Sequence, residues 1–162
     1  MEDIWNITAL VVSVLSVLLS LYALRQATTK NTSDMYLFFI SQYAKEDMKL
    51  ALRKLKDIKR GVYRLEQWES DMKNNLPKAF EYDEARRLVK YFYDTLAYMK
   101  LEKLIEARFV RLICLKKGAW LYLDTVEAME KFFDSGYDKK PYAVIRDVCE
   151  NLPVSYTHLR AH

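Results

Sequence analysis

Few residues of this sequence have side chains suited to catalysis or to metal binding. The two histidines, His158 and His162, both lie at the C-terminal end. A zinc site needs at least three protein ligands, so this pair is insufficient by itself. The two cysteines, Cys114 and Cys149, are far apart in the sequence and form no zinc motif. We expect both to be reduced thiols that fill the core as small apolar side chains.

A group of neighbouring carboxylates, Glu81, Asp83 and Glu84, is the best candidate for acid–base chemistry. Asp83 directly precedes a predicted helix over residues 84–105, however, and is well suited to cap its first turn. The common glycine-rich motifs that hold nucleotide phosphates are absent from the sequence. We therefore expect a protein that is not an enzyme, with no catalytic residue, no cofactor and no bound metal ion.

Basic residues recur at helical spacing in one segment and form a basic stripe. The stripe consists of Lys45, Lys49, Arg53, Lys56 and Arg60. Such a stripe attracts an anionic lipid leaflet, an acidic partner or the phosphates of a nucleic acid. A solvated helix face is the simpler interpretation, because Glu46, Asp47 and Asp57 interrupt the same helix. The modest net charge of +4 makes nucleic acid the least favoured partner.

A second group of cations, Arg86, Arg87 and Lys90, lies in the first turns of the helix predicted over residues 84–105. The helix dipole disfavours cations at that end. Acidic neighbours such as Glu81 or Glu84 could compensate the charge, and so could a partner. We take this group as the first candidate for a protein or lipid contact.

The elements that must position these residues are predicted to be helices. Only three glycines and three prolines occur in 162 residues, which disfavours a turn-rich all-β fold. Apolar residues at spacings of three and four indicate one helix face at Met48, Ala51, Leu52, Leu55, Ile58 and Val62. A second apolar face is predicted at Ala85, Leu88, Phe92, Leu96 and Met99. Further helices are expected over residues 106–117 and 119–134, with a break at Gly118, and from Pro141 onward.

The run of residues 4–24 contains no charged side chain. A helix over this run spans roughly 32 Å, which matches a bilayer core of about 30 Å. Trp5 and Tyr22 lie near its ends, where aromatic rings favour the headgroup region. A cleaved signal peptide is disfavoured by the acidic start, Glu2-Asp3, and a soluble helix by the length of the run. We therefore predict a single transmembrane helix.

Arg25 and Lys30 follow the predicted span and no basic residue precedes it. The positive-inside rule then predicts an inner (cytoplasmic) membrane protein whose C-terminal domain is cytoplasmic. Small residues within and just beyond the span recur at heptad spacing. This seam consists of Ala9, Ser13, Ser16, Ser20, Ala23 and Ala27. It favours a homodimer through close helix approach, unless these residues are merely tolerated in a helix that lipid surrounds.

The sequence thus divides into five predicted segments. A short N-terminal tail (residues 1–3) precedes the transmembrane helix (4–24) and a juxtamembrane segment or hinge (25–33). An all-α domain, a small antiparallel helical bundle, follows over residues 34–153. Residues 154–162 look like translated sequencing-adapter DNA, so we exclude them from the fold and expect the native sequence after Pro153 to be missing.

Two segments carry a resemblance to a known family. These are "KEDMKLALRKL" (residues 45–55) and "DEARRLVKYFYDTLAYMKLEKLI" (residues 83–105). Together with the uncharged N-terminal run, they resemble a bacterial family of small single-pass membrane proteins with a cytoplasmic helical domain of unknown function. Lys103 stands where such proteins often have glycine, which implies a different helix ending. The resemblance implies architecture and topology, and no chemistry.

Two functions are consistent with these features. The first is a membrane-anchored interaction or scaffold module that binds the lipid bilayer, a protein partner and a second copy of itself. The second is a small membrane-active assembly, a pore or lysis factor, in which the serines of the seam line a polar path.

Overall fold

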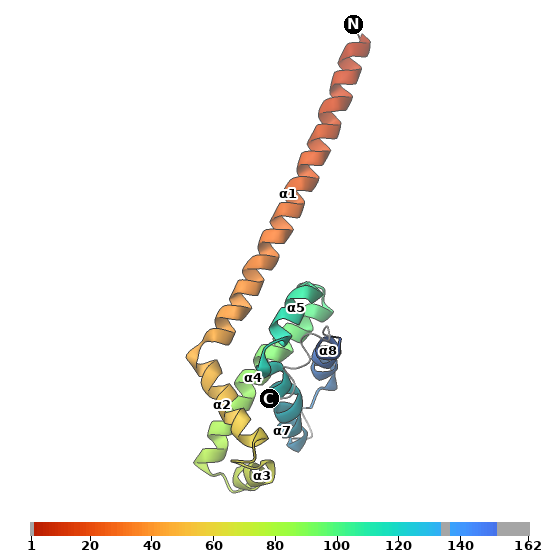
Figure 1. The fold of residues 1–162 in the computed structure, drawn as a ribbon. Coiled ribbons are helices and arrows are strands. Elements are labelled where there is room, and N and C mark those ends of the chain that lie inside the picture. The colour runs from red at the N-terminus through yellow and green to blue at the C-terminus, as the bar shows by residue number, and fades with distance from the viewer. Residues whose placement is uncertain (1, 134–136, 152–162) are drawn as a thin grey trace. The chain divides into compact units, whose positions relative to one another are not determined.

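The structure, a computed structural model, describes residues 2–133 and 137–151. Within residues 2–32, side chains are described for residues 15–23 and 26 only. Every regular element in the described part of the chain is a helix, so the all-α prediction is confirmed (Figure 1). The elements are α1 (Glu2–Ala44), α2 (Glu46–Lys59), α3 (Leu65–Lys73), α4 (Pro77–Leu101), α5 (Ala107–Cys114), α6 (Lys117–Leu121), the π-helical turn η1 (Tyr122–Val126), α7 (Glu127–Phe132) and α8 (Lys139–Glu150).

The chain forms two compact units, Met1–Leu37 and Phe38–His162. The first unit is helical, and its described apolar side chains are exposed at Leu15, Val17, Leu18, Leu19, Leu21 and Tyr22. Among the residues whose side chains are described, no helix combines the length and the apolar composition that crossing a bilayer requires. The predicted span, residues 4–24, contributes only residues 15–23 to that set, and the rest of it lies outside the described side chains.

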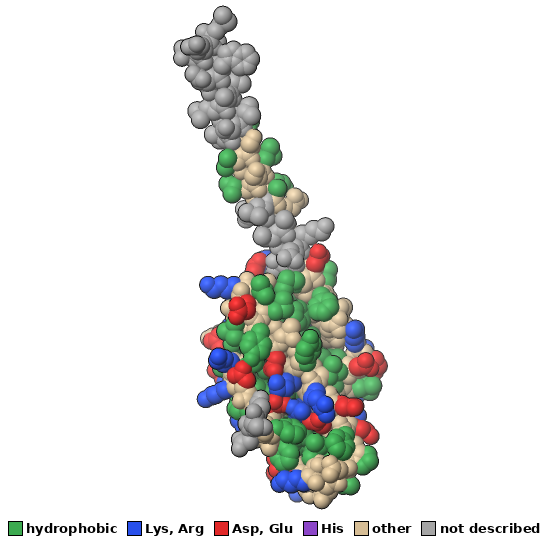
Figure 2. Space-filling view, turned by 180° about the vertical axis from the view of Figure 1, so that it is seen from behind, with side chains coloured by type: hydrophobic (Ala, Val, Ile, Leu, Met, Phe, Trp, Pro, Cys, Tyr) green, Lys and Arg blue, Asp and Glu red, His purple; other side chains and the backbone are tan. Residues whose placement is uncertain are grey.

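The second unit is organised around α4, which contacts α2, α3, α5, α8 and η1. Val89, Tyr93 and Leu96 of α4 are fully buried in these contacts. Burial of such apolar side chains is the main favourable term in folding. The face of the molecule in Figure 2 shows acidic and basic side chains interspersed with apolar ones over this unit, so no single sign of charge dominates that face.

The predicted apolar face of α2 is confirmed at Met48, Ala51, Leu55 and Ile58, which are buried. Val62 is an exception, since it lies beyond the end of the helix with 72% of its surface exposed. On α4 the predicted face is confirmed at Ala85, Phe92 and Leu96, and Leu88 is partly exposed.

Three helices end in the same Schellman geometry. Gly61, Asn75 and Lys103 follow α2, α3 and α4 with φ angles of 75°, 53° and 58°. In each motif the next residue donates a backbone hydrogen bond to the third-last helical carbonyl, as Leu104 N does to Met99 O at 2.9 Å. The different ending expected from Lys103 is therefore not observed, because the lysine adopts the left-handed conformation that glycine favours.

Several predicted helix boundaries are wrong. The central helix begins at Pro77, whose fixed φ suits the first helical turn, so Asp83 lies within α4 and does not cap it. The helix predicted over residues 106–117 ends at Cys114, and Gly118 lies inside α6. The helix predicted over residues 119–134 is divided by the π-helical turn η1. The start predicted near Pro141 is confirmed to within two residues, since the last helix begins at Lys139, where Asp138 accepts a hydrogen bond from the Lys140 amide at 2.9 Å.

Candidate functional site

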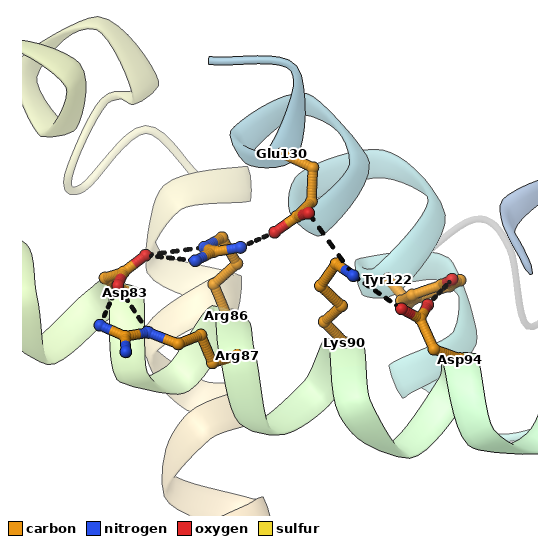
Figure 3. Close-up of polar contacts among 7 residues, drawn as sticks. All are labelled: Asp83, Arg86, Arg87, Lys90, Asp94, Tyr122 and Glu130. Carbon is orange, nitrogen blue, oxygen red and sulfur yellow. Dashed lines mark hydrogen bonds and ion pairs between the residues drawn. The ribbon is translucent and has the colours of Figure 1, made fainter. Parts of the chain in front are cut away.

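The cations predicted on α4 belong to a network of ion pairs inside the second unit (Figure 3). Arg86 is only 8% exposed, and its Nε and Nη2 both lie 2.7 Å from Asp83 Oδ1. Its guanidinium also pairs with Glu130 of α7. Arg87 is largely exposed and donates from Nε to Asp83 Oδ2 at 2.8 Å. The carboxylates that compensate these cations are therefore Asp83 and Glu130, and not Glu81 or Glu84.

Lys90 extends the same network toward η1. Its Nζ lies 2.7 Å from Asp94 Oδ2 and 3.6 Å from Glu130 Oε2. Tyr122 of η1 donates its hydroxyl to Asp94 Oδ1 at 2.5 Å (Figure 3). Burial, together with this bond to a carboxylate, raises the pKa of Tyr122 far above that of a free tyrosine. The network connects α4 with η1 and α7. Each of its cations has a carboxylate partner, so none of them is left unpaired to bind a ligand.

The basic stripe of α2 lies in a different setting, along a cavity of about 510 Å³ between α2 and α6. We call this cavity the basic groove. Its charged lining residues are Lys49, Arg53, Lys56, Lys59, Arg60 and Lys117. Four of these were predicted as part of the stripe, whereas the fifth predicted residue, Lys45, lines a separate cavity of about 320 Å³ with Phe38 and Tyr91.

The remaining surface of the basic groove is apolar or aromatic. Tyr43, Leu52, Trp120 and Leu121 line it together with Gly118. The Gly118 amide donates to the Tyr43 hydroxyl at 3.2 Å. A Cβ atom at Gly118 would lie 2.8 Å from the Tyr93 hydroxyl and 2.9 Å from the Tyr43 hydroxyl. It would also lie 3.1 Å from Leu52 Cδ2 of α2. The absence of a side chain at this position therefore lets α6 pack closely on these three residues, next to Lys117 and Trp120 of the groove.

Most of the charge along the basic groove is uncompensated. Lys49 pairs with Glu46 at 3.4 Å, and Lys59 pairs with Asp124 at 2.7 Å. Within the described part of the chain, no ion pair forms at Arg53, Lys56, Arg60 or Lys117. Among the described residues, the lining contains no carboxylate, cysteine or serine. The arrangement of cations suits the binding of an anion.

The two cysteines meet in the core, where α5 and α8 pack together. Both are free and buried. The neighbouring Cys149 thiol and burial raise the pKa of the Cys114 thiol, which keeps it protonated and weakly reactive. The remaining candidate carboxylates are exposed, and Glu81 pairs with Lys54 at 3.0 Å.

The other predicted sites are only partly described. Ser16, Ser20 and Ala23 of the seam are exposed, and Ser20 donates its hydroxyl to the Ser16 carbonyl at 2.8 Å within the same helix. The side chains of Ala9, Ser13 and Ala27 lie outside the described residues, as do both histidines and the adapter-like residues 154–162. The described residues contain no group of three or more acidic, histidine or cysteine side chains that could hold a metal ion.

Sequence reasoning missed Lys59, Lys117, Tyr43 and Trp120 as groove residues. Lys59 follows Lys56 by three positions on the same helix, so helical spacing could have added it to the stripe. No local signal connects Trp120 and Lys117 with α2, because that proximity arises from tertiary packing. Comparisons with protein-family models, with curated proteins and with solved structures found no match to this chain.

Proposed function

We propose that this protein is a membrane-anchored helical interaction module whose second unit binds an anionic partner in the basic groove. The observation that carries the proposal is the contrast between two groups of cations. Arg86, Arg87 and Lys90 are compensated within the chain. The groove cations Arg53, Lys56, Arg60 and Lys117 surround a cavity without an ion pair among the described residues.

The membrane anchor is supported by the exposed apolar side chains of α1. Residues 17, 18 and 19 follow one another, so successive side chains point in different directions around the helix. A helix that is apolar on all sides needs cover from a bilayer or from other protein. The uncharged run of residues 4–24 supports the bilayer, and Arg25 and Lys30 support a cytoplasmic location of the second unit at the inner membrane.

The anionic partner is expected to interact with the groove in a salt-dependent manner. We expect Arg53→Glu/Lys56→Glu to abolish binding of anionic probes, because reversal replaces attraction with repulsion at two residues of the lining. The measurement is calorimetric titration of the detergent-solubilised full chain with a hexaglutamate peptide, sodium triphosphate and vesicles that contain phosphatidylglycerol.

The matched control is Arg64→Glu/Arg111→Glu, which changes the net charge equally at exposed positions outside the groove. Equal loss of binding in both double variants would show that net charge, and not the groove, attracts the probe. Unchanged circular dichroism in each variant would show that the helices remain folded.

A membrane-active assembly remains the alternative function, supported by the serine seam. Ser20 is less suited to line a polar path, because its hydroxyl already donates a hydrogen bond to the Ser16 carbonyl within the same helix. Dye release from sealed vesicles distinguishes the two functions: an anchored interaction module leaves the vesicles sealed, and a pore or lysis factor empties them.

A further inference from the structure

We infer that the ligand of the basic groove is an organic polyphosphate, a small molecule in which several phosphate charges are joined to an aromatic or apolar body. This inference rests on the proposed function, because it names the chemical class of the anion. It follows from the number and arrangement of the cations, from the aromatic and apolar residues of the lining, and from the residue types that the described lining lacks.

The cations are arranged to hold more than one phosphate. Arg53, Lys56 and Arg60 follow one another along a single face of α2, at spacings of three and four. Residues seven apart on a helix are separated by about 10 Å along its axis, which exceeds the size of a single phosphate. Lys117 adds a cation from α6, on a separate part of the wall. An extended chain of phosphates can contact all four with less rearrangement of the side chains than a single phosphate requires.

The uncharged part of the lining fits an aromatic body. Trp120 and Tyr43 line the groove together with Leu52 and Leu121, so the groove combines apolar surface with cations. Aromatic rings stack on heterocyclic bases, so these side chains favour a ligand that carries such a base. The cavity volume of about 510 Å³ falls within the range of roughly 300–1,000 Å³ that small-molecule sites occupy. A concave site of this size, open on one side, fits a small ligand better than a flat membrane surface or a long acidic peptide.

The lining also indicates how the phosphates are neutralised. Magnesium is held in proteins by carboxylates together with substrate phosphates. The described lining contains no carboxylate, and the nearby acids Glu46 and Asp124 are paired with Lys49 and Lys59. Direct contact with lysine and arginine therefore replaces a metal ion, and the polyphosphate binds in its metal-free form.

The test is calorimetric titration of the full chain in nonionic detergent with adenosine triphosphate as the probe. We expect the affinity to fall from the triphosphate to the diphosphate to the monophosphate, with no binding of adenosine. Excess magnesium is expected to weaken binding, because it neutralises phosphate charge and gains no ligand from the groove. If magnesium strengthens binding, the metal-free arrangement is wrong.

Three variants connect the binding to the groove. Arg53→Gln/Lys56→Gln is expected to weaken binding of adenosine triphosphate about tenfold or more, because two charge-assisted contacts are lost. Trp120→Leu is expected to weaken adenosine triphosphate but to leave inorganic triphosphate unchanged. The control Arg64→Gln/Arg111→Gln is expected to bind as the unsubstituted protein does. Nucleotide binding that all three variants retain would place the ligand elsewhere and overturn the inference.

The inference and the proposed function fail in different ways. If hexaglutamate or phosphatidylglycerol vesicles bind through Arg53 and Lys56 while adenosine triphosphate does not, the polyphosphate inference is overturned and the interaction module stands. If no anionic probe binds, both are overturned.

Discussion

At the scale of single residues, the left-handed conformation of Lys103 is an unusual feature. A non-glycine residue in this region costs roughly 1–2 kcal/mol, because its Cβ approaches the following carbonyl oxygen. Asn75 occupies the same position after α3, and asparagine adopts the left-handed conformation more readily than lysine. Gly61 occupies this position after α2 and adopts the conformation without that cost. The lysine is tolerated because the surrounding Schellman hydrogen bonds satisfy the last carbonyls of α4.

We predict that Lys103→Gly raises the free energy of unfolding by about 0.5–1 kcal/mol, since relief of the left-handed strain exceeds the entropy cost of glycine. The reciprocal change, Gly61→Ala, is predicted to lower it by about 1 kcal/mol. No atom lies within 4 Å of a Cβ at Gly61, so the loss is conformational and not steric. Urea unfolding followed by the fluorescence of the buried Trp68 measures both. A Lys103→Gly midpoint at or below that of the unsubstituted protein would contradict the argument.

At the scale of elements, the ion-pair network explains how α7 and η1 are held on α4. The π-helical turn at Tyr122–Val126 places Tyr122 where its hydroxyl reaches Asp94. A π-helical turn inserts an extra residue into the helix and so shifts the faces that follow it. Glu130 then contacts both Arg86 and Lys90 from α7. The orientation of these short helices is therefore set by polar contacts as well as by apolar packing.

We predict that Arg86→Met destabilises the second unit by about 3–5 kcal/mol, because the buried carboxylates Asp83 and Glu130 lose their buried partner and keep only Arg87 and the more distant Lys90. Glu130→Met in the same chain is expected to recover part of that loss, since it removes a buried charge that is then poorly compensated. Arg87→Met is expected to cost less than about 1 kcal/mol, because its side chain is exposed. Chemical unfolding of the three variants tests the network. Equal losses of unfolding free energy in Arg86→Met and Arg87→Met would show that the buried ion pairs stabilise the unit no more than the exposed one does.

At the scale of the whole molecule, the proposed anchor determines where the second unit acts. A helix of about 20 apolar residues partitions into a bilayer, whereas a soluble helix of this kind must be buried in protein. The seam of small residues would then decide whether two anchors associate, because close backbone approach drives helix association in lipid.

We predict that the full-length protein is found in the membrane fraction of a cell lysate and resists extraction with carbonate at high pH. A chain that lacks residues 4–24 is expected to move to the supernatant. Recovery of the uncleaved full chain in the aqueous fraction would overturn the anchor. A Ser16→Cys variant tests the seam in the same preparation, because oxidative cross-linking between two chains requires the two helices to approach at this position.

Features that depend on local periodicity could be predicted from the sequence. Apolar spacing predicted the buried face of α2 at Met48, Ala51, Leu55 and Ile58, because a helix repeats every 3.6 residues. The same periodicity predicted the basic stripe, four members of which line the groove. Composition predicted the all-α class.

What these faces contact emerged from the packing of the helices. The sequence made Arg86 the first candidate for a contact and placed Arg53 in a stripe whose simpler interpretation was a solvated face, but Arg86 is compensated by Glu130 and Arg53 lines an open cavity. The spacing of residues in the sequence could not show that Lys117 and Trp120 complete the groove. Nor could it show that Gly118 lies within a helix that packs against Tyr43. The physical reason is that local sequence specifies the conformation of a segment, whereas ion pairs and cavities arise between segments that are distant in the chain.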